Sequence, residues 1–391
     1  MTARQFYITL FMIVVSLKVQ KLPSLISESL GKDSYLLVLA FLAVNLVGIF
    51  LAFFILKRTK NMSLSEKSKS AVGMVFKKIL LLGMAVYFLS QCMLLYESIQ
   101  NLFAHVLFYE LPWTMFSLML AGAVFYLAYT GIGNISLNFE LYAVLILISY
   151  IVISIFGGTK ADFSAVLPLE TINFKQIGEK IIDFNLWFGD FFLVLFMGKH
   201  AKHIKLKWVA FVYTAAMLFV SLLFVEFFGI YENYTPMKPS LISVLSEQSM
   251  LGVNIGRVDW FFILFTEIGT ILSAGACLFF AKKCLSFVFP KIKEHWLLLF
   301  LTIVIYFVDI FYLVDVHTQK ELFMKFMPYV SLTVKLVSLV SLLFISFMKN
   351  NKNSQENNEK IEQNAENFNT QDEYFKPKPE KPKLKMVGGK R

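Results

Sequence analysis

The stretch that decides the fold runs from Phe6 to Tyr35 and reads FYITLFMIVVSLKVQKLPSLISESLGKDSY. It begins as an apolar helix typical of a membrane span, and it then carries Lys18, Lys21 and Pro23. Because a helix rises about 1.5 Å per residue, Lys18 would lie about 18 Å inside the span. A charge at that depth costs at least about 2.5 kcal/mol, and proline interrupts the helical hydrogen bonds. The stretch therefore predicts a broken helix around a cavity, since irregular backbone at membrane depth is tolerated only inside protein or beside water.

The composition of the whole chain also indicates a membrane protein. Of its 391 residues, 57% are hydrophobic and only 16% are charged, and long apolar runs recur along the sequence. The formal net charge of +10 would suit nucleic acid, but the basic residues gather at the ends of apolar runs and in the C-terminal tail. Membrane topology and anionic lipid explain that distribution. We therefore expect membrane lipid as a partner and no nucleic acid.

Apolar runs of about 20 residues predict ten spans in two groups of five. They cover residues 6–30, 34–56, 76–100, 110–130, 136–157, 183–199, 206–229, 257–281, 295–315 and 325–348. The first span of each group is interrupted, by Pro23 in one and by Gly189 and Asp190 in the other. Paired broken helices indicate an inverted-repeat transporter with its binding site at the midplane. The expected fold class is therefore an all-α polytopic membrane protein with ten transmembrane helices, a five-plus-five inverted repeat and discontinuous helices 1 and 6.

The expected domains are a permease-like unit, residues 1–348, with repeats at about 6–157 and 183–348, and a tail, residues 349–391. Lysines and arginines concentrate in the connections after the second, sixth and eighth spans, so the positive-inside rule places both termini in the cytoplasm. The tail is rich in Asn, Gln, Lys and Pro, which predicts disorder. Its basic end, residues 376–385, either contacts anionic headgroups or is simply solvated.

Three segments carry a resemblance to a known family. They are KLPSLISESLGKDSYL (21–36), AVLPLETINFKQIGEKIIDFNLWFGDFFLVL (165–195) and GRVDWFFILF (256–265). Their order and spacing resemble those of the B-subunit permeases of bacterial spore germinant receptors, within the amino acid, polyamine and organocation transporter superfamily. Asp190 stands where that family has Glu, and Ser16 and Lys18 stand where superfamily members have small glycines. A lysine would then hold a ligand carboxylate directly or substitute for a coupling sodium ion.

The resemblance implies a ligand-sensing subunit in the inner membrane of a spore or in a bacterial cell membrane. It implies an A-type membrane subunit and a C-type lipoprotein as partners, and a small nutrient such as an amino acid as the ligand. No phosphate-binding loop, HExxH or paired-carboxylate motif occurs in the sequence, so we expect neither an enzyme nor a cofactor or metal site. The alternatives are a proton- or cation-coupled amino acid transporter, and a structural subunit with a vestigial site.

Lys18 is the centre of the predicted site. It either contacts an anionic group of the ligand or pairs with Asp190 across the two broken helices. Ser16 and Gly189 would expose backbone at the breaks. Tyr87 and Gln91 on the third span are further candidates for ligand contact, and such residues also commonly bond a neighbouring helix.

Four more charged positions inside spans are candidates for ion or proton coupling: Glu226, Glu267, Asp309 and Lys335. Glu267 is one candidate partner for Lys335. Glu226 and Asp309 have no evident partner, and proximity to the outer interface would also explain them.

Overall fold

The computed structural model describes residues 1–20, 22–58, 74–103, 112–159, 161–166, 174–201, 203–231, 259–310 and 325–341. These residues are overwhelmingly helical and include no strand, so the predicted all-α class is confirmed. The chain divides into two units, Met1–Leu343 and Phe344–Arg391. The predicted tail, residues 349–391, lies outside the described residues.

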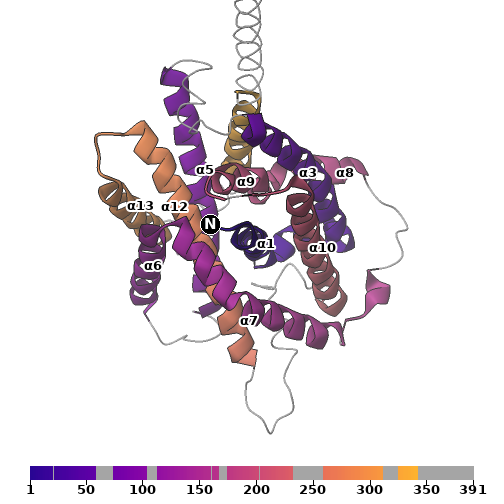
Figure 1. Cartoon of the computed structure of the whole chain (residues 1–391). Helices are drawn as coiled ribbons and strands as arrows, with labels where there is room; N and C mark the ends of the chain where they lie inside the picture. The colour runs from indigo at the N-terminus through magenta and orange to yellow at the C-terminus, as the bar shows by residue number, and fades with distance from the viewer. Residues whose placement is uncertain are drawn as a thin grey trace, which may run out of the picture. The chain divides into compact units, whose positions relative to one another are not determined.

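Every predicted span contains described helix (Figure 1). The first half holds α1 (Ala3–Val19), α2 (Leu22–Leu30), η1 (Gly31–Asp33), α3 (Ser34–Arg58), α5 (Met74–Leu102), α6 (Trp113–Thr130) and α7 (Ile132–Gly158). The second half holds η3 (Phe163–Ala165), α8 (Phe174–Asp183), η4 (Asn185–Trp187), α9 (Asp190–Gly198), α10 (Leu206–Tyr231), α12 (Asp259–Val288) and α13 (Glu294–Val308). Residues 325–341 form a further helix.

Length and apolar composition show that several of these helices suit a membrane. Within the described ranges, six helical runs are long and apolar enough to cross one, and a seventh is the bent pair Lys175–Asp183 and Asn185–Gly198. α1 and α13 are shorter, with 17 and 15 residues. Since about 20 residues are needed to span the hydrocarbon, the predicted count of ten stays a prediction.

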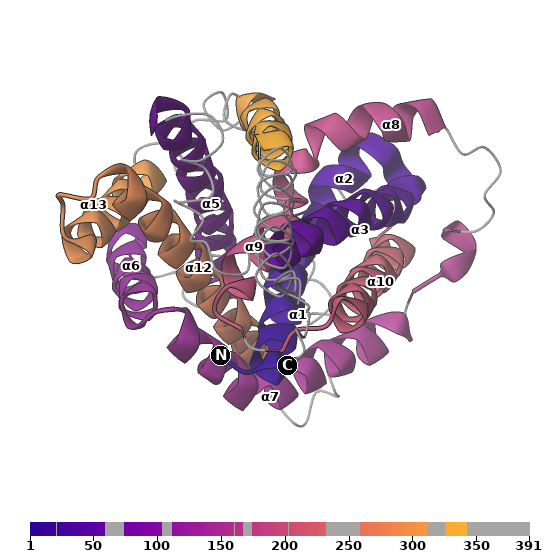
Figure 2. The same cartoon turned by 45° about the horizontal axis from the view of Figure 1, so that its top comes forward.

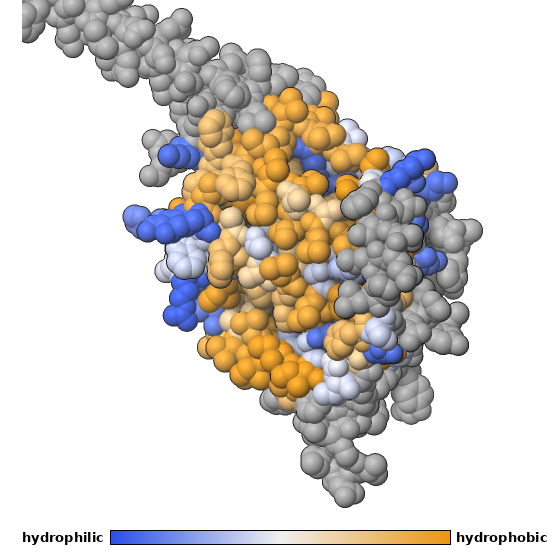
Figure 3. Space-filling view, turned by 90° about the vertical axis from the view of Figure 1, so that its right-hand side faces the viewer, coloured by the Kyte–Doolittle hydropathy of each residue, from blue (hydrophilic) through white to orange (hydrophobic). Residues whose placement is uncertain are grey.

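The surface of the outer helices supports the same conclusion. α6 and α7 expose large apolar side chains, including Met119 at 64% and Leu141 at 67%. Figure 3 shows one face on which apolar residues cover most of the described surface, with hydrophilic residues beside them. Soluble proteins rarely expose contiguous apolar patches of this kind, whereas lipid-facing helices do.

α1 lies at the centre of the described helices and contacts α7, α9, α10 and α12 (Figures 1 and 2). Most of its residues are buried, from Phe6 to Val19, and Lys18 is among them. A helix that is apolar around its whole circumference belongs in the interior of a bundle. The first helix is therefore the core against which the others pack.

Both predicted interruptions are present. α1 ends at Val19 and α2 begins at Leu22, so Pro23 occupies the first turn of α2. A proline ring clashes with the carbonyl four residues earlier, which here belongs to Val19, whereas a first helical turn tolerates proline because its N–H groups have no partner there. The second interruption lies at Phe188 and Gly189, between η4 and α9. A 63° bend lies a few residues earlier, between Lys175–Asp183 and Asn185–Gly198.

Candidate functional site

The two interrupted helices bring Lys18 and Asp190 together in a buried ion pair. The Lys18 Nζ lies 2.9 Å from the Asp190 Oδ1, and the two side chains are 0% and 1% exposed. Lys18 belongs to the last turn of α1 and Asp190 to the first turn of α9. The predicted pairing across the breaks is therefore confirmed, while ligand contact by either residue stays a prediction.

Helix ends and neighbouring side chains stabilise this pair. The partial negative charge at a helix C-terminus favours the Lys18 ammonium, and the partial positive charge at a helix N-terminus favours the Asp190 carboxylate. Tyr213 of α10 donates to the second oxygen, Oδ2, at 2.9 Å. The Lys18 Nζ also lies 5.2 Å from the ring centroid of Phe188, which stacks on Phe41. These contacts offset the desolvation of two charges, which otherwise makes buried pairs costly.

Lys335 brings a second buried cation to the same place. Its Nζ donates to the Asn185 Oδ1 at 2.6 Å and to the Asn185 backbone carbonyl, and it lies 5.1 Å from the ring centroid of Tyr87. The candidate pairing with Glu267 is wrong, because Glu267 accepts a hydrogen bond from Gln20 instead. Lys335 lies against the break before α9, whereas Glu267 on α12 lies against the break after α1.

The backbone before α9 is held by close packing. A Cβ on Gly189 would overlap the Tyr87 hydroxyl and would lie 2.5 Å from the Lys335 Cε, so only glycine fits there. Gln91 donates from its side-chain amide to the backbone carbonyl of Leu186. The two α5 residues expected near the site, Tyr87 and Gln91, therefore both contact this break, each through a bond or contact to a neighbouring segment.

Ser16 does not lie at a break. It is inside α1, three residues before the helix ends, so its amide belongs to a regular helical turn. The residue at the break is Gln20, which caps α1 and donates to the carboxylate of Glu267. The expected exposure of backbone at Ser16 is therefore wrong, because the proline at position 23 stops the helix at Val19 and not earlier.

Glu226 and Asp309 both have partners. The Ser154 hydroxyl donates to the Glu226 Oε1 at 2.5 Å, and the Ser117 hydroxyl donates to the Asp309 Oδ2 at 2.9 Å. Both acids are buried, and the second carboxyl oxygen of each has no hydrogen-bond partner among the described residues. The expectation that they lack partners is wrong, and these contacts connect neither acid to the central ion pair.

Three residues of the site were not predicted: Tyr213, Asn185 and Gln20. Tyr213 is a hydroxyl-bearing residue inside the apolar run of α10, a feature that it shares with other polar residues of the spans. Asn185 follows Asp183 and precedes Gly189, and asparagine favours irregular backbone. Its amide also donates to the Pro328 carbonyl at 2.9 Å, which ties this segment to the helix at residues 325–341.

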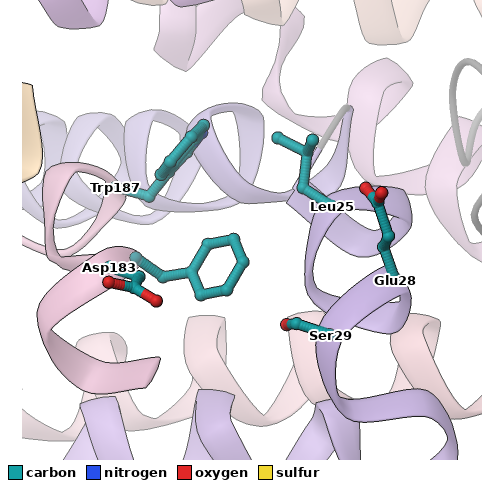
Figure 4. A pocket seen from close by; sticks show the side chains of 6 residues that line it. Leu25, Glu28, Ser29, Asp183 and Trp187 are labelled. Atoms are coloured by element: carbon teal, nitrogen blue, oxygen red, sulfur yellow. The ribbon is translucent and has the colours of Figure 1, made fainter. Parts of the chain in front are cut away.

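The ion pair is closed to water in this structure, because the two side chains expose almost no surface. A cavity of about 420 Å³ lies between α2 and the segment before α9, next to the second break. Figure 4 shows Trp187 and Asp183 on one side of it and Leu25, Glu28 and Ser29 on the other. The Asp183 carboxylate is also 2.8 Å from the Lys180 Nζ. The cavity thus presents carboxylates beside an aromatic wall.

Apolar helices, two interrupted helices and a buried charged cluster together define a permease-like integral membrane protein. The comparison with family models then gives the family: residues 1–318 match the model of spore germination proteins, and the chain belongs to that family. The family is transporter- or receptor-like and is not a family of enzymes. A comparison with curated proteins finds no match. The resemblance carried by the three segments is therefore confirmed, and Lys335 lies beyond the matched range.

Proposed function

We propose that this protein is the germinant-sensing subunit of a spore germination receptor. It binds a small nutrient that carries a carboxylate, such as an amino acid, between helices 1 and 6 of a ten-span, five-plus-five inverted-repeat fold. Membership of the spore germination family supports the general role. The observation that carries the ligand chemistry is the meeting of two buried lysines with a single aspartate.

The charges around residues 188–190 do not balance. Lys18 pairs with Asp190, and Lys335 packs against Gly189 while its ammonium is held by the two oxygens of Asn185, which are neutral. Asp190 and Lys18 are the charged electrostatic neighbours of Lys335 among the described residues. A buried cation without a counter-charge costs several kcal/mol. A ligand carboxylate at Lys335 supplies that counter-charge, and this is why we favour an anionic group in the ligand.

The route to the site begins in the cavity between α2 and Trp187. Glu28 lines this cavity and attracts an ammonium group there, while Lys18 and Lys335 favour a carboxylate at the ion-pair site, so a zwitterionic amino acid suits both ends of the path. Entry to the closed ion pair requires the segment between α8 and α9 to move. A ligand with higher affinity for the opened arrangement shifts the population toward it, and that shift is the signal.

The assembly and orientation that we propose follow from the sequence. Both termini lie in the cytoplasm, because lysines and arginines concentrate in the connections on that side. An A-type membrane subunit and a C-type lipoprotein receive the conformational signal, as in the receptors that the three segments resemble.

The second candidate function is proton- or cation-coupled amino acid transport. It is favoured by the three buried acids Glu226, Glu267 and Asp309, each with one carboxyl oxygen that has no partner among the described residues. Intramembrane acids of this kind commonly carry protons in transporters.

One experiment tests both candidates. The full-length protein is screened for thermal stabilisation by single amino acids, since a ligand at about 100 Kd raises stability by about 2.7 kcal/mol. Each ligand found is then offered, radiolabelled, to proteoliposomes with and without a proton gradient. Binding without uptake supports sensing, and gradient-dependent uptake supports transport in its place. If no nutrient binds, both proposals fail and the structural role remains.

A further inference from the structure

A second cavity is lined by residues that take part in none of the contacts described above. It has a volume of about 590 Å³ and runs between α5, α12 and α13. All its lining side chains are apolar, among them Leu82, Val86 and Leu89 of α5, Leu285 of α12, and Trp296 and Phe300 of α13. Leu82, Trp296 and Phe300 are also exposed, at 45%, 59% and 59%. The cavity is therefore a groove that opens onto the lipid-facing surface.

One end of this groove is basic. The N-terminus of α5 lies near the turn that connects α12 to α13 (Figures 1 and 2). Lys78 precedes Leu82 by four residues, so it lies on the same face of α5, one turn closer to that end. Lys291 and Lys293 are exposed in the turn between α12 and α13, on either side of Ile292, which lines the groove.

The neighbouring acid does not cancel these charges. Glu294 is the first residue of α13, and its carboxylate lies 2.7 Å from the Nζ of Lys283, so that pair is neutral. Within the part of the chain that the structure describes, three lysines from two separate elements thus remain as positive charge beside an apolar groove. A lysine near an anionic membrane surface contributes about 1 kcal/mol to lipid binding, and basic sites between transmembrane helices bind anionic headgroups.

We propose that this groove binds one anionic phospholipid. An acyl chain lies between α5 and α13, and the phosphate headgroup lies at Lys78, Lys291 and Lys293. Trp296, at the mouth of the groove, has the amphipathic ring that suits the level of the headgroups. The charge at one end of the groove selects an anionic lipid over a zwitterionic lipid of the same chain length.

The test uses the full-length protein in detergent and measures lipid retention by native mass spectrometry. The probes are dioleoylphosphatidylglycerol and dioleoylphosphatidylcholine, which have the same chains and differ in headgroup charge. The headgroup variant combines Lys78→Gln, Lys291→Gln and Lys293→Gln. Its matched control combines Lys175→Gln, Lys205→Gln and Lys207→Gln, which removes the same charge from exposed lysines elsewhere. The groove variant, Val86→Trp, fills the space for the chain.

The wild type and the control should retain one molecule of phosphatidylglycerol in preference to phosphatidylcholine. The headgroup variant should bind phosphatidylglycerol about a hundredfold more weakly, because each of the three cations contributes about a fivefold factor. Val86→Trp should lose both lipids. Equal retention of the two lipids by the wild type, or an equal loss in the control and the headgroup variant, overturns the proposal. The headgroup variant alters only exposed residues, so it decides the question even if Val86→Trp does not fold.

Discussion

The Lys18 ammonium and the Asp190 carboxylate, 172 positions apart in the sequence, meet at 2.9 Å where one broken helix ends and another begins. The pair therefore joins the two interruptions of the chain. Anything that changes its charge balance should act on both α1 and α9.

Removing one partner of this pair should be costly. Lys18→Met leaves the Asp190 carboxylate buried without its cation, so we expect a loss of about 3–5 kcal/mol in the free energy of unfolding. Denaturation of the purified protein in detergent measures the change. Removing both charges, in Lys18→Met with Asp190→Leu, should restore part of the stability.

The pair of Arg4 and Glu140, 3.0 Å apart, provides the control, because the Arg4 side chain is 75% exposed. Arg4→Ala should cost at most about 1 kcal/mol, because solvent screens such pairs. If Lys18→Met costs no more than Arg4→Ala, the buried pair does not hold the two helices together.

The close packing of Tyr87 and Lys335 leaves no room for a side chain at position 189. Gly189→Ala places a methyl group against the Tyr87 hydroxyl, so we expect a clear loss of stability that Tyr87→Phe, which removes the hydroxyl, partly restores. Gly122→Ala is the matched control, since a Cβ there meets no atom within 4 Å and lies within a helix. The control should be neutral or stabilising by up to about 1 kcal/mol. Equal melting temperatures for the two single variants would contradict the packing described.

Asn185 should matter mainly because it holds Lys335. Asn185→Ala removes one of the two oxygens that bind the Lys335 ammonium, and it leaves the buried donor under-satisfied. We expect a loss of about 1–3 kcal/mol. Asn134→Ala, at an exposed asparagine that bonds the Thr130 carbonyl at 3.4 Å, should change the stability by less than about 0.5 kcal/mol. When Lys335→Met is combined with Asn185→Ala, most of the loss of stability should disappear. An undiminished loss in this double variant would show that Asn185 acts in another way.

The sequence predicts the two breaks because Pro23 and the Gly189–Asp190 pair interrupt apolar runs. It predicts the Lys18–Asp190 pair because a charge at membrane depth needs a partner. It expects exposed backbone at Ser16, whereas counting four residues back from Pro23 leads to Val19, where α1 ends. The suggested pairing of Lys335 with Glu267 is wrong, because the depth of a residue in a span does not indicate which neighbouring helix its side chain faces.

Other parts of the site depend on tertiary contacts that no local pattern encodes. Tyr213 reaches Asp190 from α10, and Asn185 reaches Lys335 from a turn of 3₁₀ helix. Hydroxyl and amide groups of this type occur throughout the apolar runs, so only the packing of the helices selects the ones that meet the charges. The serine partners of Glu226 and Asp309 escape sequence analysis for the same reason.

Whether Lys335 binds the carboxylate of a nutrient is tested by how ligand affinity depends on that carboxylate and on Lys335. Calorimetry would measure the affinity for an amino acid that stabilises the wild-type protein and for the corresponding amino acid amide, in which a neutral group replaces the carboxylate. Both affinities would be measured for the wild type, for Lys335→Gln and for the control Lys207→Gln. We predict that the amide binds the wild type at least about tenfold more weakly, and that Lys335→Gln loses that discrimination while Lys207→Gln keeps it. Equal discrimination between acid and amide in the wild type and in Lys335→Gln would contradict the account.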